Sequence, residues 1–442
     1  MNMKKCRGRT FRKRRRNHSR CFSQRGVNLS HKCEYIHLKK WLKERGFEDS
    51  ILRPAQFSET GRGLMTTKAL QAGQLIIALP EKCLLTTDTV LNSYLGEYII
   101  KWRPPISPLT ALCTFLIAEK YYHKKSVWQP YLDLLPETYT CPVYLEQQAV
   151  NLFPEPLRGK ALEQKSLVEQ QYTSSKSFFF SLQPLFPEHV ESVFSYSAFQ
   201  WAWCTINTRT VYMKHPQKEC FSREPDNYAL APFLDLLNHS PTVQVKAAFN
   251  ERTRCYEIKT LSHCAKYQEV FINYGPHDDQ RLLLEYGFVA ASNPHNCVHV
   301  DTDTLLKYLI PEDKQRHIKV SILQEYKLLD NLTFGWDGPS WRLLTALKLL
   351  CLDAHQFTSW KKVLLGDAIS ERNEKKSLDL AKKICTSLTE KTQRALHKIS
   401  RLKQDNVDLV NQLSFLEALH TEDLNILLLS AENLLQMNCT TI

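Results

Sequence analysis

The stretch Asp235-Leu236-Leu237-Asn238-His239-Ser240 marks the point where an apolar run ends and two polar side chains follow it. The run from Ala231 to Leu237 predicts a buried strand or short helix, so Asn238 and His239 are expected where that element leaves the core. Both side chains donate and accept hydrogen bonds, which lets them fix a loop or hold the adenine edge of a nucleotide-like ligand. His239 alone is read as a structural histidine rather than a catalytic one. A metal-binding role is also disfavoured, because no second His or Cys stands at the spacing of a metal ligand.

Three further strings flank this stretch: Gly61-Arg62-Gly63-Leu64 before it, and Phe271-Ile272-Asn273-Tyr274-Gly275 and Glu285-Tyr286-Gly287-Phe288 after it. The first string predicts a turn between two strands, in which both glycines permit positive φ and expose backbone N–H groups to a ligand. Taken alone, it is read as an ordinary hairpin turn. A phosphate-binding loop is disfavoured because no Gly-Lys-Ser/Thr sequence follows.

Tyr274 and Tyr286 lie twelve residues apart, and each is followed by glycine. A tyrosine hydroxyl can accept a hydrogen bond from an incoming amine, and the face of its ring attracts a cation. Either tyrosine by itself is read as a buried structural residue. Two of them at the mouth of a channel would favour a positively charged ligand and align a nucleophile.

The order and spacing of the four strings resemble those of SET-domain methyltransferases. The helical pattern between the first two strings, and the helical C-terminal region, resemble the subclass typified by RuBisCO large-subunit methyltransferase, from about residue 30 onward. This resemblance implies an α+β protein: a pseudoknotted β-rich SET domain over 31–298 with a helical insertion at about 88–200. An all-helical substrate-binding domain would follow over 299–442, and residues 1–30 would form a disordered basic arm.

The resemblance also implies roles for individual residues, with S-adenosylmethionine as the cofactor and no metal. One group would contact the cofactor, hold its adenine and methionine ends and close its pocket: Arg62, Gly63, Leu64, Arg209, Asn238, His239 and Tyr274. Tyr286, with Tyr274, would be catalytic at the methyl-transfer pore. Pro241 departs from the family pattern, because histone-type members have cysteine after Asn-His-Ser.

The implied activity is protein-lysine N-methylation, with a protein substrate that is plausibly histone H3 or H4. Only the neutral amine is nucleophilic, and roughly one lysine in a thousand is neutral near pH 7 when the pKa is about 10.4. A histidine-methylating enzyme on the same scaffold stays open, since imidazole and amine nucleophiles need similar pores. A chromatin or protein-interaction scaffold that has lost catalysis is the other alternative, although the intact set of strings argues against it.

The net charge of +12 is concentrated at the N-terminus. Residues 1–25 hold eleven Lys and Arg and no Asp or Glu, so nearly all of the excess lies there and the body is close to neutral. The cluster Arg12-Lys13-Arg14-Arg15-Arg16 is typical of a segment that binds a nuclear import receptor; nucleic-acid binding and a tail without a partner are alternatives. Direct nucleic-acid binding by the folded body is disfavoured, and we expect the protein in nucleus and cytoplasm.

With 442 residues, 43% of them hydrophobic, the chain can bury a large core in about two or three folded units. No apolar run reaches the ~18 residues of a membrane span, and the charged N-terminus does not resemble a secretory signal. The 14 cysteines lack the paired spacing of a zinc module, so most are expected to be reduced, buried small hydrophobes.

Local patterns predict several helices. Residues 31–47 have helical apolar spacing ending at Gly46, and Ser107-Pro108 is a typical helix start. The aromatic clusters around Phe178 and Phe199 are expected in the core. The stretch Gly335-Trp336-Asp337-Gly338-Pro339 predicts a turn that separates subdomains. Residues 367–442 contain neither Gly nor Pro, and their apolar spacing favours an intramolecular helical bundle over a coiled-coil dimer seam.

Overall fold

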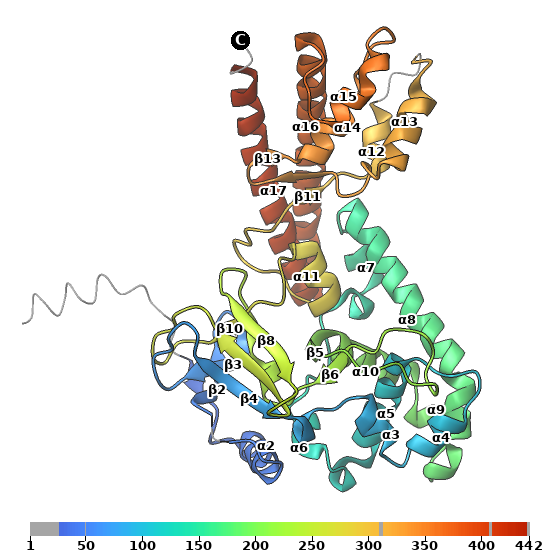
Figure 1. Ribbon diagram of the computed structural model, residues 1–442, viewed down its shortest axis with the longest axis vertical. Coiled ribbons are helices and arrows are strands. Elements are labelled where there is room, and N and C mark those ends of the chain that lie inside the picture. Colours follow the sequence, from blue (N-terminus) through green and yellow to red (C-terminus); the bar gives the residue numbers. More distant parts are fainter. Residues whose placement is uncertain (1–25, 49, 309–312, 406–408, 440–442) are drawn as a thin grey trace, which may run out of the picture. The chain divides into compact units, whose positions relative to one another are not determined.

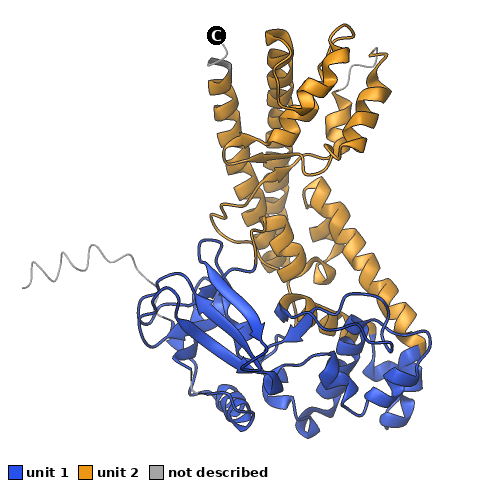
Figure 2. Cartoon of the chain, in the orientation of Figure 1, with its two compact units in different colours: residues 1–136, 178–195, 209–274 blue, residues 137–177, 196–208, 275–442 orange. Residues whose placement is uncertain are grey.

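The computed structural model describes residues 26–48, 50–308, 313–405 and 409–439 (Figure 1). The Arg12-Arg16 cluster, and with it the predicted import signal, lies outside the described residues. Two compact units make up the chain, and each is assembled from separate stretches (Figure 2). Unit 1 comprises residues 1–136, 178–195 and 209–274, and unit 2 comprises residues 137–177, 196–208 and 275–442. Within the described ranges, no helix combines the length and the apolar character needed to cross a membrane.

The described residues of unit 1 form four small sheets rather than one large one. Two of them are three-stranded and antiparallel, in the orders β1-β2-β3 and β4-β9-β8. The pair β5-β6 is antiparallel and the pair β7-β10 is parallel. The strands are β1 (Val27–Asn28), β2 (Leu52–Phe57), β3 (Gly61–Thr66), β4 (Leu75–Pro80), β5 (Thr210–Tyr212), β6 (Tyr228–Leu230), β7 (Asn238–His239), β8 (Val245–Asn250), β9 (Cys255–Thr260) and β10 (Phe271–Ile272).

Unit 1 also contains several helices. They are α2 (Cys33–Glu44), α3 (Thr87–Leu91), α4 (Gly96–Lys101), α5 (Pro108–Tyr122), α6 (Gln129–Leu132) and α9 (Val190–Val193), with 3-10 turns at Glu81–Cys83, His123–Lys125, Gln183–Leu185 and Leu234–Leu236. Helix α2 ends at Glu44, and Gly46 follows with φ +88°, as predicted for a helix stop. Ser107 caps α5 by accepting a hydrogen bond from the Thr110 N–H at 3.0 Å, and Pro108 is the first helical residue, which confirms the predicted start.

Two long helices carry the aromatic clusters, α8 (Glu155–Ser181) and α10 (Tyr196–Arg209). Phe178 and Phe179 are buried in unit 1, where Phe179 stacks on Phe194. Phe199, with the neighbouring Trp201 and Trp203, is buried in unit 2. The predicted core role is therefore confirmed, except that the adjacent Phe180 is exposed.

Unit 2 is mainly helical, with one small sheet. Its further elements are α7 (Gln147–Val150), α11 (Asp279–Tyr286), β11 (Val298–His299), α12 (Thr302–Lys307), α13 (Arg316–Glu325), β12 (Thr333–Gly335), β13 (Gly338–Pro339), α14 (Trp341–Leu350), α15 (Trp360–Leu364), α16 (Glu371–Asp405) and α17 (Val410–Cys439), with 3-10 turns at Pro142–Tyr144 and Phe357–Ser359. The strands form an antiparallel sheet in the order β11-β12-β13. The region after residue 298 is thus helical with a three-stranded sheet inside it.

The two longest helices, α16 and α17, pack antiparallel against each other within one chain. Cys385 lies opposite Leu427, and Lys403 pairs with Glu417 at 2.5 Å. Their apolar residues, including Ile384, are buried in the cores of unit 2. This packing confirms the predicted intramolecular arrangement.

The prediction that residues 335–339 separate two subdomains is wrong. Trp336 and Asp337 form the turn of the β12-β13 hairpin, with Gly335 and Gly338 paired across it. Phe334 beside them is fully buried in the same core as residues of α14 and α17. A turn-rich sequence reports local chain reversal, and it carries no information about whether the reversal lies between cores or inside one.

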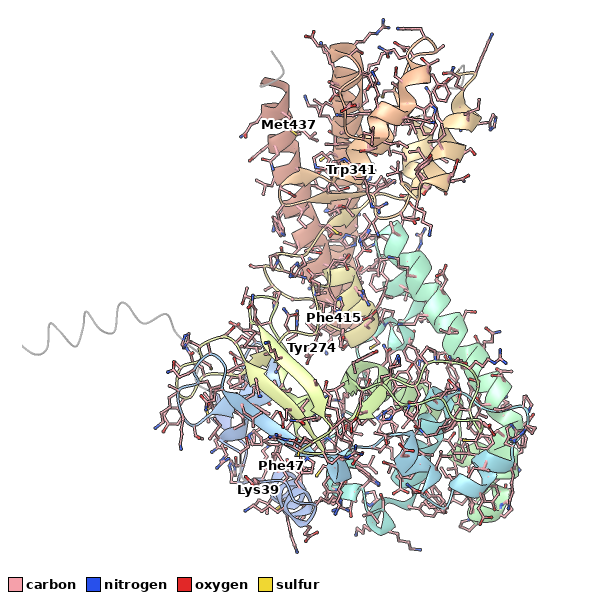
Figure 3. All side chains as sticks on the ribbon, in the orientation of Figure 1. Lys39, Phe47, Tyr274, Trp341, Phe415 and Met437 are labelled. Atoms are coloured by element: carbon pink, nitrogen blue, oxygen red, sulfur yellow. The ribbon has the colours of Figure 1, made fainter. Side chains whose placement is uncertain are left out.

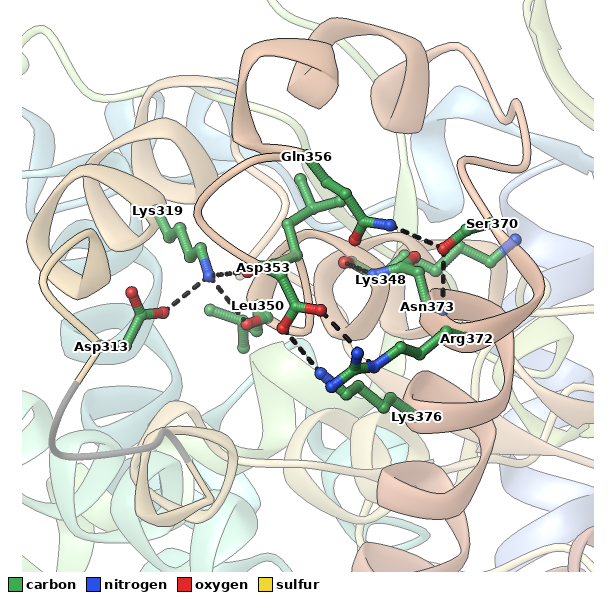
Figure 4. A network of polar contacts seen from close by, with 11 residues as sticks. Asp313, Lys319, Lys348, Leu350, Asp353, Gln356, Ser370, Arg372, Asn373 and Lys376 are labelled. Atoms are coloured by element: carbon green, nitrogen blue, oxygen red, sulfur yellow. Dashed lines mark hydrogen bonds and ion pairs between the residues drawn. The ribbon is translucent and has the colours of Figure 1, made fainter.

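A network of polar contacts joins residues of the α13–α16 region of unit 2 (Figure 4), and the Lys319 side chain in it is buried. The Lys319 ammonium, on a side chain that is only 1% exposed, donates to Asp313 at 2.6 Å and to the backbone carbonyls of Leu350 and Leu352 at 3.2 and 2.6 Å. Three partners match the three donors of an ammonium group, so the buried charge is fully hydrogen-bonded.

The eleven cysteines from Cys33 to Cys385 are free thiols, in line with the expectation of a reduced protein. Five of them are buried and six are partly or fully exposed. The expectation that most are buried is therefore wrong for this set.

Candidate active site

The glycine string forms a strand rather than a turn. The reversal comes earlier, at residues 58–60, and β3 begins at Gly61 and pairs with β2. Gly61 has φ +76°, as expected for a turn exit, whereas Gly63 has no positive φ. A Cβ at Gly63 would lie 2.5 Å from Glu269 Oε1 and 2.8 Å from Asn238 Nδ2. Glycine is needed at 63 because other side chains approach the bare backbone there.

Asn238 joins the glycine strand to its neighbours. Its Nδ2 donates to the Arg62 carbonyl at 3.0 Å and to Glu269 Oε1 at 2.7 Å, so both amide hydrogens are used. The other oxygen of Glu269 accepts from the Thr60 hydroxyl at 2.6 Å. Burial raises the pKa of Glu269, and the hydrogen bonds from Asn238 and Thr60 oppose that shift. Asn238 therefore fixes the position of the Arg62 backbone at the site.

His239 and Tyr274 fix each other. Strand β7, which holds Asn238 and His239, pairs in parallel with β10, and Tyr274 lies two residues beyond β10 (Figure 3). His239 Nδ1 accepts the Tyr274 backbone N–H at 3.1 Å, which assigns the imidazole proton to Nε2 in the neutral form. The two rings are tilted with centroids 5.1 Å apart, and the Tyr274 hydroxyl donates to the Leu237 carbonyl at 2.7 Å. The tyrosine ring is thus held at both ends.

Two arginines lie in the same unit. Arg62 Nη1 donates to the Leu134 carbonyl at 2.8 Å. Arg209, the last residue of α10, pairs with Asp235 at 3.3 Å, and the Tyr131 hydroxyl donates to the same carboxylate oxygen at 3.0 Å. Burial raises the pKa of Asp235, and the charge of Arg209 opposes the rise. The site therefore holds a desolvated carboxylate beside a guanidinium.

Leu64 contributes packing. Its side chain is fully buried and its carbonyl accepts the Val270 N–H at 2.8 Å. Any contact of Leu64 with a ligand must therefore involve its backbone.

Tyr286 lies in unit 2, at the C-terminal end of α11. Gly287 caps this helix in the left-handed conformation, with φ +77°, and donates to the Leu283 carbonyl. The Tyr286 ring stacks on His277, with centroids 6.2 Å apart. Burial, and then the nearby charge of Glu285, raise the pKa of the Tyr286 phenol. The hydroxyl therefore stays protonated and remains a hydrogen-bond donor over the physiological range.

Side chains from other segments of unit 2 hold this helix end. Asn207 donates to the Glu285 carbonyl at 2.9 Å, and Gln164 donates to the Leu284 carbonyl at 2.8 Å. These bonds satisfy two of the last carbonyls of α11, which have no partner within the helix. They restrict how far the Tyr286 backbone can shift.

Seven of the eight predicted site residues lie in unit 1, and the eighth, Tyr286, lies in unit 2. Sequence reasoning missed Asp235 and Glu269 as site residues, although Asp235 begins one quoted string and Glu269 stands two residues before another. The available signal was a carboxylate within an apolar run, since an unpaired buried charge is costly and implies a partner. A cavity of about 380 Å³ in unit 1 is lined by Thr60, Glu269 and Phe271 among others, and none of the eight predicted residues lines it.

Comparison with known proteins shows the family of each part of the chain. Residues 61–275 match the SET domain family, and residues 310–427 match the family described as Rubisco LSMT substrate-binding. The chain is 61% identical to SET domain-containing protein 4 of Mus musculus over 97% of this chain and 98% of that one. It is 61% identical to the Homo sapiens protein of the same name over 98% of both chains.

More distant matches have defined activities in their names. The chain is 25% identical to ribosomal lysine N-methyltransferase set11 of Schizosaccharomyces pombe over 70% of this chain and 73% of that one. It is 25% identical to actin-histidine N-methyltransferase of Canis lupus familiaris. This match covers 76% of this chain and 55% of that one.

A solved structure shares the fold. It is described as the SET domain of LSMT bound to lysine and AdoHcy, and it superposes with a TM-score of 0.64 over 93% of both chains at 18% identity. The matched domains and the near-complete coverage at 61% identity agree with each other. The chain belongs to the SET domain-containing protein 4 family, in which a SET domain is joined to a Rubisco LSMT-type substrate-binding domain.

Proposed function

We propose that the protein is an S-adenosylmethionine-dependent protein-lysine N-methyltransferase. One observation carries the proposal: side chains from three distant strings converge in unit 1, where Asn238 bonds the glycine strand at Arg62 and His239 bonds the backbone of Tyr274. SET-domain methyltransferases bind their cofactor with residues of these three strings. A chain that no longer bound the cofactor would have no need to keep all three joined.

The side chains of this site suit S-adenosylmethionine. That molecule presents a carboxylate, an amino group, ribose hydroxyls and an adenine edge. Arg62 and Arg209 provide cationic donors, and Asp235 is a carboxylate in the same unit. His239 Nε2 carries a proton that can be donated. When bound, the cofactor supplies a methyl group activated by a sulfonium.

The residues of the chain would act by binding and orienting. Because the Tyr274 hydroxyl donates to Leu237, the incoming amine would donate to the phenol oxygen. Tyrosine surroundings that exclude water would lower the pKa of the target lysine, at about 1.4 kcal/mol per unit. Holding the reactants in line would contribute several kcal/mol more, about 7–11 for well-oriented reactants. Water can remove the proton, so no side-chain base is required.

Lysine is the proposed target, and histidine is the second candidate. The matched chain with a lysine activity in its name aligns over 73% of its length, whereas the actin-histidine enzyme aligns over 55% of its length. A substrate-binding domain family covers 310–427, which supports a folded protein as substrate. Histones remain our candidate substrates, and ribosomal proteins and actin belong in the same assay.

The test is transfer of labelled methyl from S-adenosylmethionine to histones, ribosomal proteins, actin and a cell lysate, with the modified residue read by mass spectrometry. We expect label on lysine, and a decrease of at least ~100-fold in kcat for Tyr286→Phe. Tyr326→Phe is the matched control, because Tyr326 is an exposed tyrosine at the end of α13.

Each other outcome selects a different function. Label on histidine alone would replace the lysine proposal by the second candidate. Cofactor binding by calorimetry without label on any protein would indicate a scaffold that has lost catalysis. Equal activity of Tyr286→Phe and wild type would remove Tyr286 from the mechanism.

We also propose that residues 12–16 give the protein access to the nucleus through an import receptor. Replacing the four arginines of this cluster by alanine should move a fluorescent fusion from nucleus to cytoplasm. An unchanged distribution would contradict this role and leave the arm without an assigned partner.

A further inference from the structure

Three potential metal ligands, none of them a predicted site residue, meet in unit 2. Asp278 is the N-cap of α11, and Cys297 and His299 flank Val298 at β11. Residues two apart in extended backbone project to the same side, so Cys297 and His299 face Asp278 together. Their ligand atoms all lie within 4.8 Å of one another, and all three residues are partly buried.

The separations suit a tetrahedral zinc ion. Cys297 Sγ lies 3.7 Å from His299 Nε2 and 3.8 Å from Asp278 Oδ2. Zinc bonds of ~2.0–2.3 Å at tetrahedral angles place ligand atoms roughly 3.3–3.8 Å apart. His299 Nε2 and Asp278 Oδ2 are 2.7 Å apart, a hydrogen bond that would open by only about half an ångström to admit the ion.

Asp278 can bind a metal without losing its structural role. Its Oδ1 accepts the Arg281 N–H at 2.8 Å and so caps α11, while Oδ2 faces His299 and Cys297. The two oxygens therefore serve different partners. A thiolate, an imidazole and a carboxylate form a donor set that favours zinc over magnesium or calcium, which prefer oxygen ligands.

A second, independent observation points to a cation. Asp423 of α17 is only 1% exposed, and its Oδ1 has no hydrogen-bond partner within the described residues. Asp423 lies near Cys297, Asp278 and the fully buried Asp279, and burial raises the pKa of Asp423 well above its usual range. Lys160 is a cation close to Asp278 and Cys297. Asp423 Oδ1 is thus a buried acceptor without a donor, and a bound cation would supply the missing partner.

A cavity reaches one of the three proposed ligands, His299, and four basic side chains also line it: Arg158, Lys391, Arg394 and Lys398. It has a volume of about 300 Å³, lies entirely in unit 2, and is lined by His299 and Asp423 along with Asp301 and His420. Asp423 and the imidazole of His299 thus border the same space. A zinc site requires such access together with ligands at the right separation.

We propose that Asp278, Cys297 and His299 form a zinc-binding site, with Asp423 as the buried carboxylate that balances its charge. The ion would join the start of α11 to β11, beside α17, so it would stabilise the helix whose other end carries Tyr286 (Figure 1). The signal in the sequence is Cys-x-His nineteen residues after an aspartate, which a search for paired Cys-x-x-C spacing overlooks.

The experiment uses the full chain after removal of metals with a chelator and exchange into reducing buffer. Cobalt(II) is titrated as a spectroscopic probe for zinc, because a thiolate ligand produces a charge-transfer band in the near ultraviolet. We expect one cobalt ion per chain with this band, its displacement by zinc, and a rise in Tm with zinc. Cys297→Ser should abolish the band, and Cys351→Ser, a partly buried cysteine of the same unit, should retain it.

Asp423→Asn provides a test that keeps all three ligands. Loss of the balancing charge should weaken zinc binding ~10- to 100-fold by calorimetry while the thiolate band persists at saturation. Absence of the band in the wild-type protein, or an equal band in Cys297→Ser, would overturn the proposal and leave His299 and Asp278 as an ordinary ion pair. Zinc affinity unchanged in Asp423→Asn would remove Asp423 from the site.

Discussion

The Asn238 amide donates a hydrogen bond to the Arg62 carbonyl at 3.0 Å, across 176 residues of sequence. The same amide donates to Glu269, so a single side chain connects β3, β7 and the segment before β10. Asn238 is the residue through which the glycine strand and the Asn-His strand become one site.

Replacing Asn238 by Ala removes both of these hydrogen bonds and leaves the Glu269 carboxylate with its hydrogen bond from the Thr60 hydroxyl. A hydrogen bond to a charged group contributes about 1.5–3 kcal/mol, so we expect a loss of ~2–3 kcal/mol in the free energy of unfolding. S-adenosylmethionine should bind more weakly by calorimetry. Asn433→Ala, which removes one 3.3 Å bond to Trp336 in unit 2, should leave cofactor affinity unchanged.

Gly63→Ala places a methyl group 2.5 Å from Glu269 Oε1 and 2.8 Å from Asn238 Nδ2. These atoms must shift, so we expect a destabilisation of ~1–3 kcal/mol, measured by urea denaturation. Gly159→Ala is the control, since Gly159 lies within α8 with nothing within 4 Å of the added methyl. There alanine should stabilise by about 1 kcal/mol. Equal effects at both positions would contradict the close approach at Gly63.

Gly287→Ala combines left-handed backbone with a clash. The added Cβ would lie 2.8 Å from Thr140 Oγ1 and 2.9 Å from the Cys141 backbone nitrogen, and φ is +77°. At Gly46, φ is +88° but nothing lies within 4 Å, so alanine should cost only the ~1–2 kcal/mol of the left-handed conformation. Gly287→Ala should cost more than Gly46→Ala in thermal denaturation. It should also lower methyl transfer, because the Tyr286 backbone must move.

Lys319→Met leaves Asp313 and two backbone carbonyls without their buried partner. Breaking a buried charge pair from one side is strongly destabilising, so we expect a loss of ~3–5 kcal/mol. The exposed Lys375→Met on α16 should change stability by less than about 0.5 kcal/mol. A small effect at Lys319 would show that the network in Figure 4 contributes little.

The lowered pKa of Asp353 predicts how the free energy of unfolding depends on pH. The hydrogen bond from Lys376 and the charge of Arg372 lower the pKa of Asp353, so its ionised form is favoured in the folded state. Its stabilisation is therefore present above pH ~4, the unfolded value, and is lost as the pH falls through the folded value. Asp353→Asn should lower the free energy of unfolding by up to about 1 kcal/mol at pH 7.5.

The difference between Asp353→Asn and wild type should shrink toward zero as denaturation is repeated at decreasing pH below about 4. Asp330→Asn, an exposed aspartate of unit 2, serves as the control and should change stability by less than about 0.5 kcal/mol at each pH. A difference for Asp353→Asn that grows on acidification would contradict the assigned direction of the shift.

The sequence by itself determined the elements that depend on neighbours along the chain. Apolar spacing, the Ser107 cap and Gly46 identified helices, because caps and faces involve residues within about four positions of each other. The order of the four strings was sufficient to identify the SET domain and the side chains gathered in unit 1. The order of these residue types can be read directly from the sequence, although the contacts between the residues cannot.

Only the tertiary structure decided which of these residues touch. The close approach at Gly63, the Asn238–Glu269 bond and the Arg209–Asp235 pair join residues from distant segments, and the fold alone brings them together. The same holds for the cluster of Asp278, Cys297 and His299. Local patterns also misplaced the turn at Gly61 and the boundary at 335–339. Hydrogen bonding and burial between distant segments depend on three-dimensional proximity, and short-range periodicity does not encode it.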